Sequence, residues 1–180
     1  METSEAHPNH TLLLWQGGDL VGSLIARPTD VLGFPNEGWD KVAASGRGER
    51  VCALGVSIDP TARGRGHSKR LLAEAKARFG AFVVPVRPTA KPVGQAMEDY
   101  LTQTTIEGLS VDPWLRTHQR IGGRVMGVSA RAMQMKAPWR QWEQWLGASP
   151  SKHNSLVGTL TQQGEMGLYS EANVWVQHGL

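Results

Sequence analysis

The sequence is poor in cysteine and in long apolar runs. Its single cysteine, Cys52, leaves no partner for an internal disulfide, and it lies in a strand-like apolar run that favours a buried structural thiol over a nucleophile. No apolar run approaches the ~18 residues that a membrane-spanning helix needs. The polar, acidic start Met-Glu-Thr-Ser-Glu is unlike a secretory signal. We therefore expect a cytoplasmic protein without a membrane partner.

The sequence also lacks a large excess of charge of either sign. The formal net charge is only +3, which is too small to indicate nucleic acid as a partner. Six basic residues nevertheless face a single acid, Glu74, between residues 61 and 78: Arg63, Arg65, Lys69, Arg70, Lys76 and Arg78. Such a cluster would attract a polyanion, or it is simply the solvated face of a helix with internal ion pairs. Both interpretations can hold together.

The 180 residues, with 40% hydrophobic and 19% charged residues, predict one globular domain over residues 11–180 behind a disordered tail, residues 1–10. Strand-like and helix-like patterns alternate along this domain. We expect a hairpin around Gly17-Gly18, an irregular stretch at 27–48, strands at 51–58, 81–86, 124–135 and 173–177, and helices at 68–79, 97–101, 113–121 and 138–146.

Several familiar catalytic patterns are missing. The sequence has neither a Ser-His-Asp order nor a Gly-x-Ser-x-Gly elbow, so no serine is a candidate nucleophile. His7 and His10 have a metal-like spacing, but they lie in the expected tail without a third ligand, and no metal site is predicted.

One stretch, residues 56–72, carries a mechanism. A β-branched run at Val56 and Ile58 is followed by a turn that contains Gly64 and Gly66 and by a helix that opens near Ser68. A glycine turn between a strand and a helix points backbone N–H groups outward at the positive end of the helix dipole, where they bind phosphate. A basic surface loop with two turn glycines is the alternative.

The spelling of this turn, Arg63-x-x-Gly66-x-Ser68, lacks the Gly-Lys-Ser/Thr ending of a P-loop and the third glycine of a dinucleotide fold. It resembles the Arg/Gln-x-x-Gly-x-Gly/Ala loop of the GCN5-related N-acetyltransferases, the GNAT family. The resemblance implies an α/β fold with a mixed central sheet and flanking helices. The family's opening strand and two helices have no counterpart before the hairpin, so we expect them to be missing.

The resemblance also implies a co-substrate, acetyl-CoA or another acyl-CoA, and no metal. Backbone groups of Val56, Ser57 and Ile58 would bind the pantetheine, and one of their N–H groups would polarise the thioester carbonyl. Main-chain N–H groups of the following loop would hold the pyrophosphate. The loop residues are Arg63, Gly64, Arg65, Gly66, His67 and Ser68.

The proton-transfer groups are less well marked. Many family members carry a glutamate base on the central strand, but the matching positions here are Leu54 and Gly55. Many also place a tyrosine acid on a later helix, and the helix at 113–121 offers His118 instead, which titrates near neutrality. His118 is a candidate catalytic residue, or a histidine that packs between helix and sheet. Tyr100 is the second candidate acid.

Three further features have two interpretations each. Arg87, Lys91 and Arg116 could bind a substrate carboxylate or the 3′-phosphate of coenzyme A, or be solvated. Tryptophans at spacing three in 138–146 favour a core or a dimer seam over stacking on bases. The edge strand left by a missing first strand invites pairing between two chains, so a homodimer is one outcome.

The sequence therefore predicts an N-acetyltransferase that transfers an acetyl or longer acyl group from acyl-CoA to an unidentified amine by direct attack. The missing base and N-terminal elements favour an alternative, a non-catalytic acyl-CoA-binding domain. A nucleic-acid binder that uses the basic helix and the tryptophans rests on local charge alone.

Overall fold

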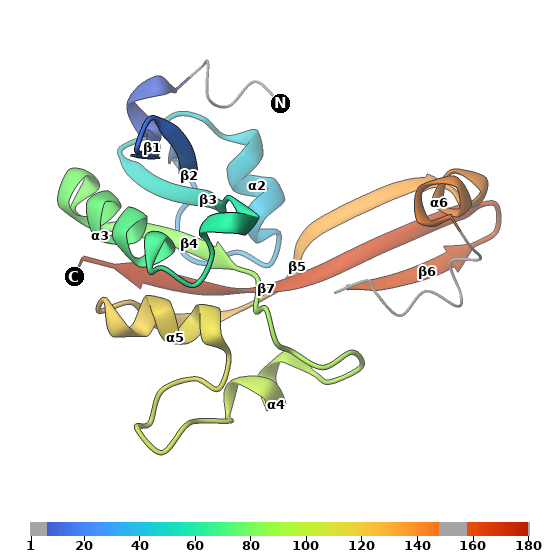
Figure 1. Ribbon diagram of the computed structural model, residues 1–180. Coiled ribbons are helices and arrows are strands. Elements are labelled where there is room, and N and C mark those ends of the chain that lie inside the picture. Colours follow the sequence, from blue (N-terminus) through green and yellow to red (C-terminus); the bar gives the residue numbers. More distant parts are fainter. Residues whose placement is uncertain (1–6, 148–157, 180) are drawn as a thin grey trace.

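The structure is a computed structural model that describes residues 7–147 and 158–179. A seven-stranded sheet runs through it in the order β1-β2-β3-β4-β7-β5, with β6 paired to β7 (Figure 1). All strand pairs are antiparallel except β3 with β4. The strands are β1 (Thr11–Gln16), β2 (Asp19–Thr29), β3 (Arg50–Ile58), β4 (Phe82–Val86), β5 (Arg124–Pro138), β6 (Thr159–Gln163) and β7 (Met166–His178). The helices are α2 (Gly38–Ala44), α3 (His67–Phe79), α4 (Met97–Leu101), α5 (Pro113–Arg120) and α6 (Trp139–Leu146), with the 3-10 turns Pro8–His10 and Pro60–Ala62.

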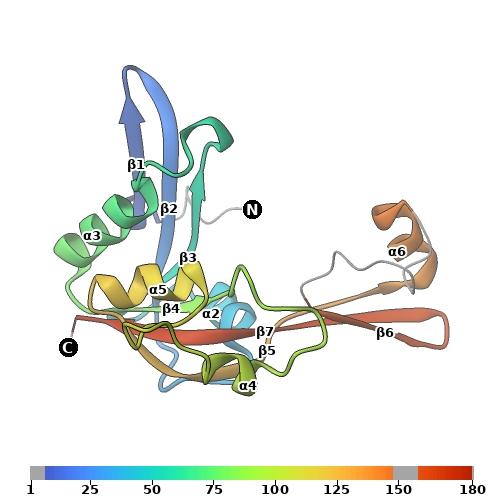
Figure 2. The same ribbon diagram turned by 60° about the horizontal axis from the view of Figure 1, so that its bottom comes forward.

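The sheet is covered on both faces. α3 and α5 lie side by side on one face (Figures 1 and 2), where Leu72 and Leu115 are fully buried against strand residues such as Val176. α2 covers the other face, where Val42 packs with Cys52 and other apolar side chains. Burial raises the pKa of the Cys52 thiol, in agreement with a structural thiol.

The parallel pair β3 and β4 opens after two residue pairs. Val51 pairs with Phe82 and Cys52 with Val83, and no later residues of the two strands are paired. On its other side β3 stays paired with β2 as far as Ile58, across an irregularity next to Ala53. Pro85 lies in β4 just beyond the last pair; a proline has no N–H to donate, so it fits a position that β3 has left.

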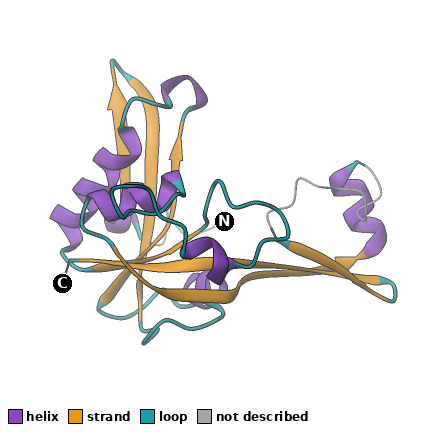
Figure 3. Cartoon of the chain, turned by 90° about the horizontal axis from the view of Figure 1, so that it is seen from below, coloured by secondary structure: helices purple, strands orange, loops and turns teal. Residues whose placement is uncertain are grey.

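β5 and β7 continue beyond the body of the sheet as a long ribbon, visible on the right of Figures 1 and 3. α6 lies near the far end of this ribbon, where Trp142, Tyr169 and Ala137 form a small separate core. Of the three tryptophans in α6, Trp142 is buried and Trp145 is 53% exposed. The three tryptophans were expected on one side of the helix as a core or a dimer seam, and the structure places Trp142 in a core.

Most predicted elements are confirmed, and three differ. The irregular stretch contains α2, the closing strand is longer than 173–177, and β6 was not predicted. Within the expected tail, Pro8–His10 form a 3-10 turn and the His10 ring stacks on Phe79; residues 1–6 lie outside the described part. Among the described residues, no helix is long and apolar enough to cross a membrane.

Candidate functional site

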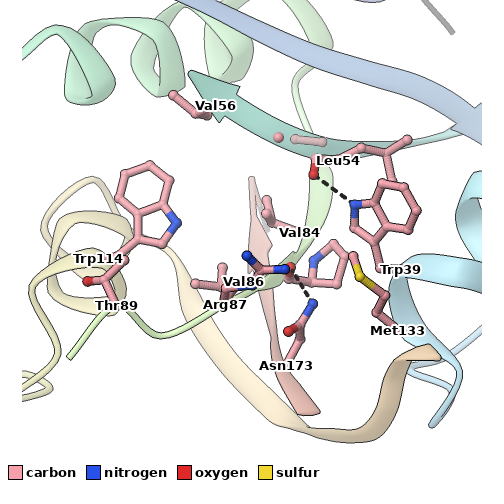
Figure 4. Close-up of a pocket in the computed structure, with 13 residues that line it drawn as sticks. Trp39, Leu54, Val56, Val84, Val86, Arg87, Thr89, Trp114, Met133 and Asn173 are labelled. Carbon is pink, nitrogen blue, oxygen red and sulfur yellow. Dashed lines mark hydrogen bonds between the residues drawn. The ribbon is translucent and has the colours of Figure 1, made fainter. Parts of the chain in front are cut away.

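The opening between β3 and β4 leads into a cavity of about 330 Å³ (Figure 4). Its walls are mostly apolar, with Trp114 and Trp39 at opposite ends and Arg87 between them. The lining residues are Trp39, Ala53, Leu54, Gly55, Val56, Val84, Pro85, Val86, Arg87, Thr89, Trp114, Met133 and Asn173.

A side chain takes the place of part of the missing strand pairing. The indole Nε1 of Trp39, on α2, donates to the carbonyl oxygen of Leu54 at 3.0 Å. That carbonyl lies on β3 two residues past the last pair with β4, so without the indole it would lack this partner at the wall of the cavity. Trp39 therefore holds the strand edge open and closes one end of the cavity.

A second cavity, of about 470 Å³, adjoins the first. The two share Val56, Thr89 and Trp114, and the second adds Ser57, Ile58, Arg63 and Ser68. The two adjoining cavities extend from the turn before α3 to the opening between β3 and β4, and we call them together the path.

The start of α3 has the geometry of an anion-binding turn. Gly66 is the N-cap residue in the left-handed region at φ 76°, and no side chain caps the helix there. The helical bonds begin with the N–H of Arg70, which donates to the carbonyl of Gly66 at 3.1 Å. The N–H groups of His67, Ser68 and Lys69 come before that bond and have no acceptor within the helix. They lie at the positive end of the helix dipole among basic side chains, where an anion is stabilised.

Asp112 fixes the loop that carries Thr89 into both cavities. Its side chain is fully buried, and Oδ2 accepts from the N–H groups of Thr89 at 2.7 Å and Ala90 at 2.8 Å. Oδ1 accepts from the N–H groups of Trp114 and Leu115 and so caps α5, a role that suits an aspartate followed by a proline at the first helical position. One carboxylate thus positions a loop and a helix that both contribute to the path.

The structure brings together five of the residues predicted to bind the cofactor: Val56, Ser57, Ile58, Arg63 and Ser68 line the second cavity. Gly64, Arg65, Gly66 and His67 form the turn beside it without lining either cavity. The His67 ring is buried, and neither of its nitrogens has a hydrogen-bond partner among the described residues. Contacts of all nine residues with a cofactor stay predictions.

The structure does not bring the two predicted catalytic residues to the path. His118 is fully buried, and its Nδ1 lies 2.9 Å from Nε2 of His178, an equally buried histidine on β7. Burial, together with His178, lowers the pKa of His118 to about 3, so the ring is neutral at pH 7. Tyr100 is buried as well, and its hydroxyl donates to Asp112 at 3.2 Å. Neither side chain lines either of these two cavities, and the position of His118 fits its packing alternative.

Of the three cations considered for a carboxylate or phosphate, one reaches the first cavity. Lys91 donates to the carbonyls of Pro92 and Gln95, and Arg116 to those of Ser110 and Val111. Arg87 lines the cavity itself.

Sequence reasoning missed Trp39, Met133 and Asn173 as lining residues. Each comes from an element whose distance along the chain hides its place in space. Pro85, a proline inside an apolar strand, is the signal that could have located the opening. Among the described residues, no group of three or more His, Cys, Asp or Glu is arranged to hold a metal.

Comparison with known proteins adds relatives in sequence and in structure. No family model matches the sequence. The arginine N-acetyltransferase avaD of Aspergillus versicolor is 28% identical over 188 aligned residues, which cover 81% of this chain and 64% of the relative. The chain thus spans somewhat less than two thirds of the length of that curated relative.

Two solved structures share the fold over 99% of this chain, each with a TM-score of 0.67 and 19% identity. One is the loading GNATL domain of CurA from Lyngbya majuscula, of which 80% is covered. The other is the GNAT-like decarboxylase GphF in complex with isobutyryl-CoA, of which 82% is covered. With its mixed sheet opened between β3 and β4 and its flanking helices, the chain has the GNAT fold that these two structures share.

Proposed function

We propose that this protein binds an acyl-CoA and transfers the acyl group to an amine by direct attack. The observation that carries the proposal is the pair of adjoining cavities, which reaches from the uncapped start of α3 to the opening between β3 and β4. The arginine N-acetyltransferase relative and the isobutyryl-CoA complex of a structural neighbour support the same co-substrate class.

The path suits the three parts of an acyl-CoA in order. The phosphates would lie against the free N–H groups at the start of α3, near Arg63 and Ser68. We call residues 63–68 the phosphate turn. The pantetheine would run along the unpaired edge of β3 from Ile58 to Val56. The acyl group would then enter the first cavity, whose apolar walls suit an alkyl chain.

In the reaction the amine nitrogen attacks the thioester carbonyl carbon, the new C–N bond forms, and the C–S bond breaks to release coenzyme A. A free N–H on the edge of β3 near Val56 would donate to the carbonyl oxygen as negative charge develops there. The ammonium must lose a proton before attack, and the leaving thiolate must gain one. The described residues that line the first cavity include no histidine, carboxylate or tyrosine that could accept the proton of the ammonium or donate one to the thiolate. We therefore assign both proton transfers to water. Catalysis would then rest on holding the two reactants in place.

That same lining favours a second candidate function, an acyl-CoA-binding domain without catalysis. A site that binds acyl-CoA but transfers no acyl group needs the phosphate turn and the open strand edge, and it needs no acid or base.

Calorimetric titration with acetyl-CoA tests the binding step. A Gly66→Trp variant places a large side chain at φ 76°, a backbone conformation that residues other than glycine rarely adopt. Because this side chain would project beside the phosphate turn, we expect binding to be lost. Gly164→Trp is the matched control, because Gly164 also has a positive φ of 62° and open space around it but lies in the β6–β7 turn. Equal binding by wild type and Gly66→Trp would contradict the phosphate turn.

Release of free coenzyme A thiol is then measured across a panel of amines and amino acids. Release that depends on one class of amine identifies an acyltransferase. Tight acetyl-CoA binding without release above the uncatalysed rate supports the binding domain instead.

A further inference from the structure

A buried carboxylate lies directly behind the first cavity. Glu171, on β7, is 1% exposed, and its Oε1 accepts from Nε of Arg87 at 2.6 Å. Its Oε2 accepts from the hydroxyl of Tyr169 at 2.7 Å, and burial with this bond raises the pKa of Tyr169 to about 12. With its amide nitrogen turned toward Glu171, Asn173 adds a third donor to this carboxylate, 2.9 Å from Oε1.

Strand register explains why these side chains meet. Tyr169, Glu171 and Asn173 alternate along β7 and therefore project from one face of the strand. Val86, the last residue of β4, pairs with Val174, so the next residue, Arg87, lies beside Asn173. The cavity wall here is thus built from the end of β4 and the inward face of β7.

The hydrogen bond to Glu171 orients Arg87 and leaves the rest of its guanidinium available. Among the described residues, its Nε is the one guanidinium nitrogen with a protein hydrogen-bond partner, and 48% of the side chain is exposed. Arg87 is also the one charged side chain among the residues that line the cavity, and Figure 4 shows its guanidinium on the side of Asn173. The two terminal nitrogens form the fork that matches a carboxylate.

Neutralising Glu171 is not a sufficient reason for this arrangement. Burying a carboxylate is costly, and a well-packed apolar pair of similar size is often as stable as a buried ion pair. The bonds from Tyr169 and Asn173 instead hold the Glu171 carboxylate in place, and the carboxylate in turn orients Arg87.

We infer that Arg87 binds a carboxylate of the substrate at the end of the path remote from the phosphate turn. Arg87 is thereby a specificity-determining residue, and Glu171 is its positioning residue. The inference rests on the proposed function and narrows it to carboxylate-bearing substrates. The carboxylate could belong to the acyl chain or to the acceptor, and the same chemistry at Arg87 would hold either.

Two binding measurements distinguish these sources. For the acyl chain, the dissociation constants of succinyl-CoA and butyryl-CoA are compared by calorimetry. For the acceptor, free amino acids are compared with their amides on protein saturated with coenzyme A. We expect the carboxylate form to bind at least about tenfold more tightly in one of the two comparisons, equal to about 1.4 kcal/mol.

The test variant is Arg87→Met combined with Glu171→Gln, which removes the arginine without leaving a buried unpaired carboxylate. Arg87→Lys is the second variant; it keeps the charge and lacks the fork. Arg120→Met is the matched control, because Arg120 is also ion-paired, with Glu107 at 3.1 Å, and lies outside the cavity.

We expect the double variant to lose the preference to within about twofold, Arg87→Lys to keep part of it, and the control to keep all of it. Coenzyme A itself should bind all four proteins alike, which separates this test from that of the phosphate turn. Binding of coenzyme A without a carboxylate preference in either comparison would overturn the inference and leave the proposed function standing. A preference that survives in the double variant would also overturn it.

Discussion

Replacing Asp112 with asparagine is the most direct test of how the path is held together. Four backbone N–H groups and the Tyr100 hydroxyl point at the fully buried carboxylate, and two of these N–H groups, from Thr89 and Ala90, bind Oδ2 at 2.7 and 2.8 Å. An asparagine keeps one acceptor oxygen and presents an NH2 group at the other position. In either orientation of the amide, two N–H groups therefore face a donor.

The expected loss follows from those two bonds. Hydrogen bonds to a charged group contribute roughly 1.5–3 kcal/mol each, so Asp112→Asn should lower the free energy of unfolding by about 3 to 6 kcal/mol. Urea denaturation followed by tryptophan fluorescence measures this difference. Asp19→Asn, an exposed change in the β1–β2 hairpin, serves as the control and should stay within about 0.5 kcal/mol of wild type. A loss below about 1 kcal/mol in Asp112→Asn would refute the role assigned to this carboxylate.

Two further predictions concern the neighbouring core. Burial lowers the pKa of His118 to about 3 and that of His178 to about 4, so both rings fold neutral and the folded state takes up protons less readily than the unfolded chain. The free energy of unfolding should therefore be at its full value above about pH 6.5 and fall as the pH drops toward 4, by up to about 1.4 kcal/mol per pH unit for each proton. In denaturation curves measured across this range, a double His118→Leu, His178→Leu variant should show a flatter dependence on pH. Gly123→Ala should cost about 1–3 kcal/mol, since its Cβ would lie 2.8 Å from the His118 carbonyl oxygen, whereas Gly55→Ala, with open space around its Cβ, should unfold near the wild-type midpoint.

The parts of the site that could be predicted from the sequence are those with local signals. The strand, glycine turn and helix from Val56 to Phe79 follow one another along the chain, and each has its own periodicity or turn residue. The cap of α5 is similar, because Asp112 and Pro113 act on the helix that they precede. These elements and the family resemblance are the basis on which the phosphate turn is proposed.

For the two candidate catalytic residues, which lie away from the path, the sequence carries no such local signal. A histidine near a cofactor site indicates acid–base chemistry only if it reaches solvent or substrate, and the sequence of α5 does not show that His178, sixty residues later, lies 2.9 Å from His118. Trp39 illustrates the same limit: its partner, the Leu54 carbonyl, is fifteen residues away and becomes available only because the strands separate. Contacts between distant segments decide these roles, and no local pattern reports them.

The underestimate of β7 marks the site itself. Its inward positions carry Tyr169, Glu171 and Asn173, so the alternation of apolar and polar residues that identifies a half-buried strand is inverted there, and the predicted strand begins only at Asn173. A polar inward face costs stability unless each buried polar group has a hydrogen-bond partner. Here Glu171 accepts from both the Tyr169 hydroxyl and Arg87. An apolar face would have made a simpler strand, but it would have left Arg87 without a fixed orientation at the cavity. The strand departs from the expected pattern beside the cavity where we infer that Arg87 binds a carboxylate, and such departures are expected at functional sites.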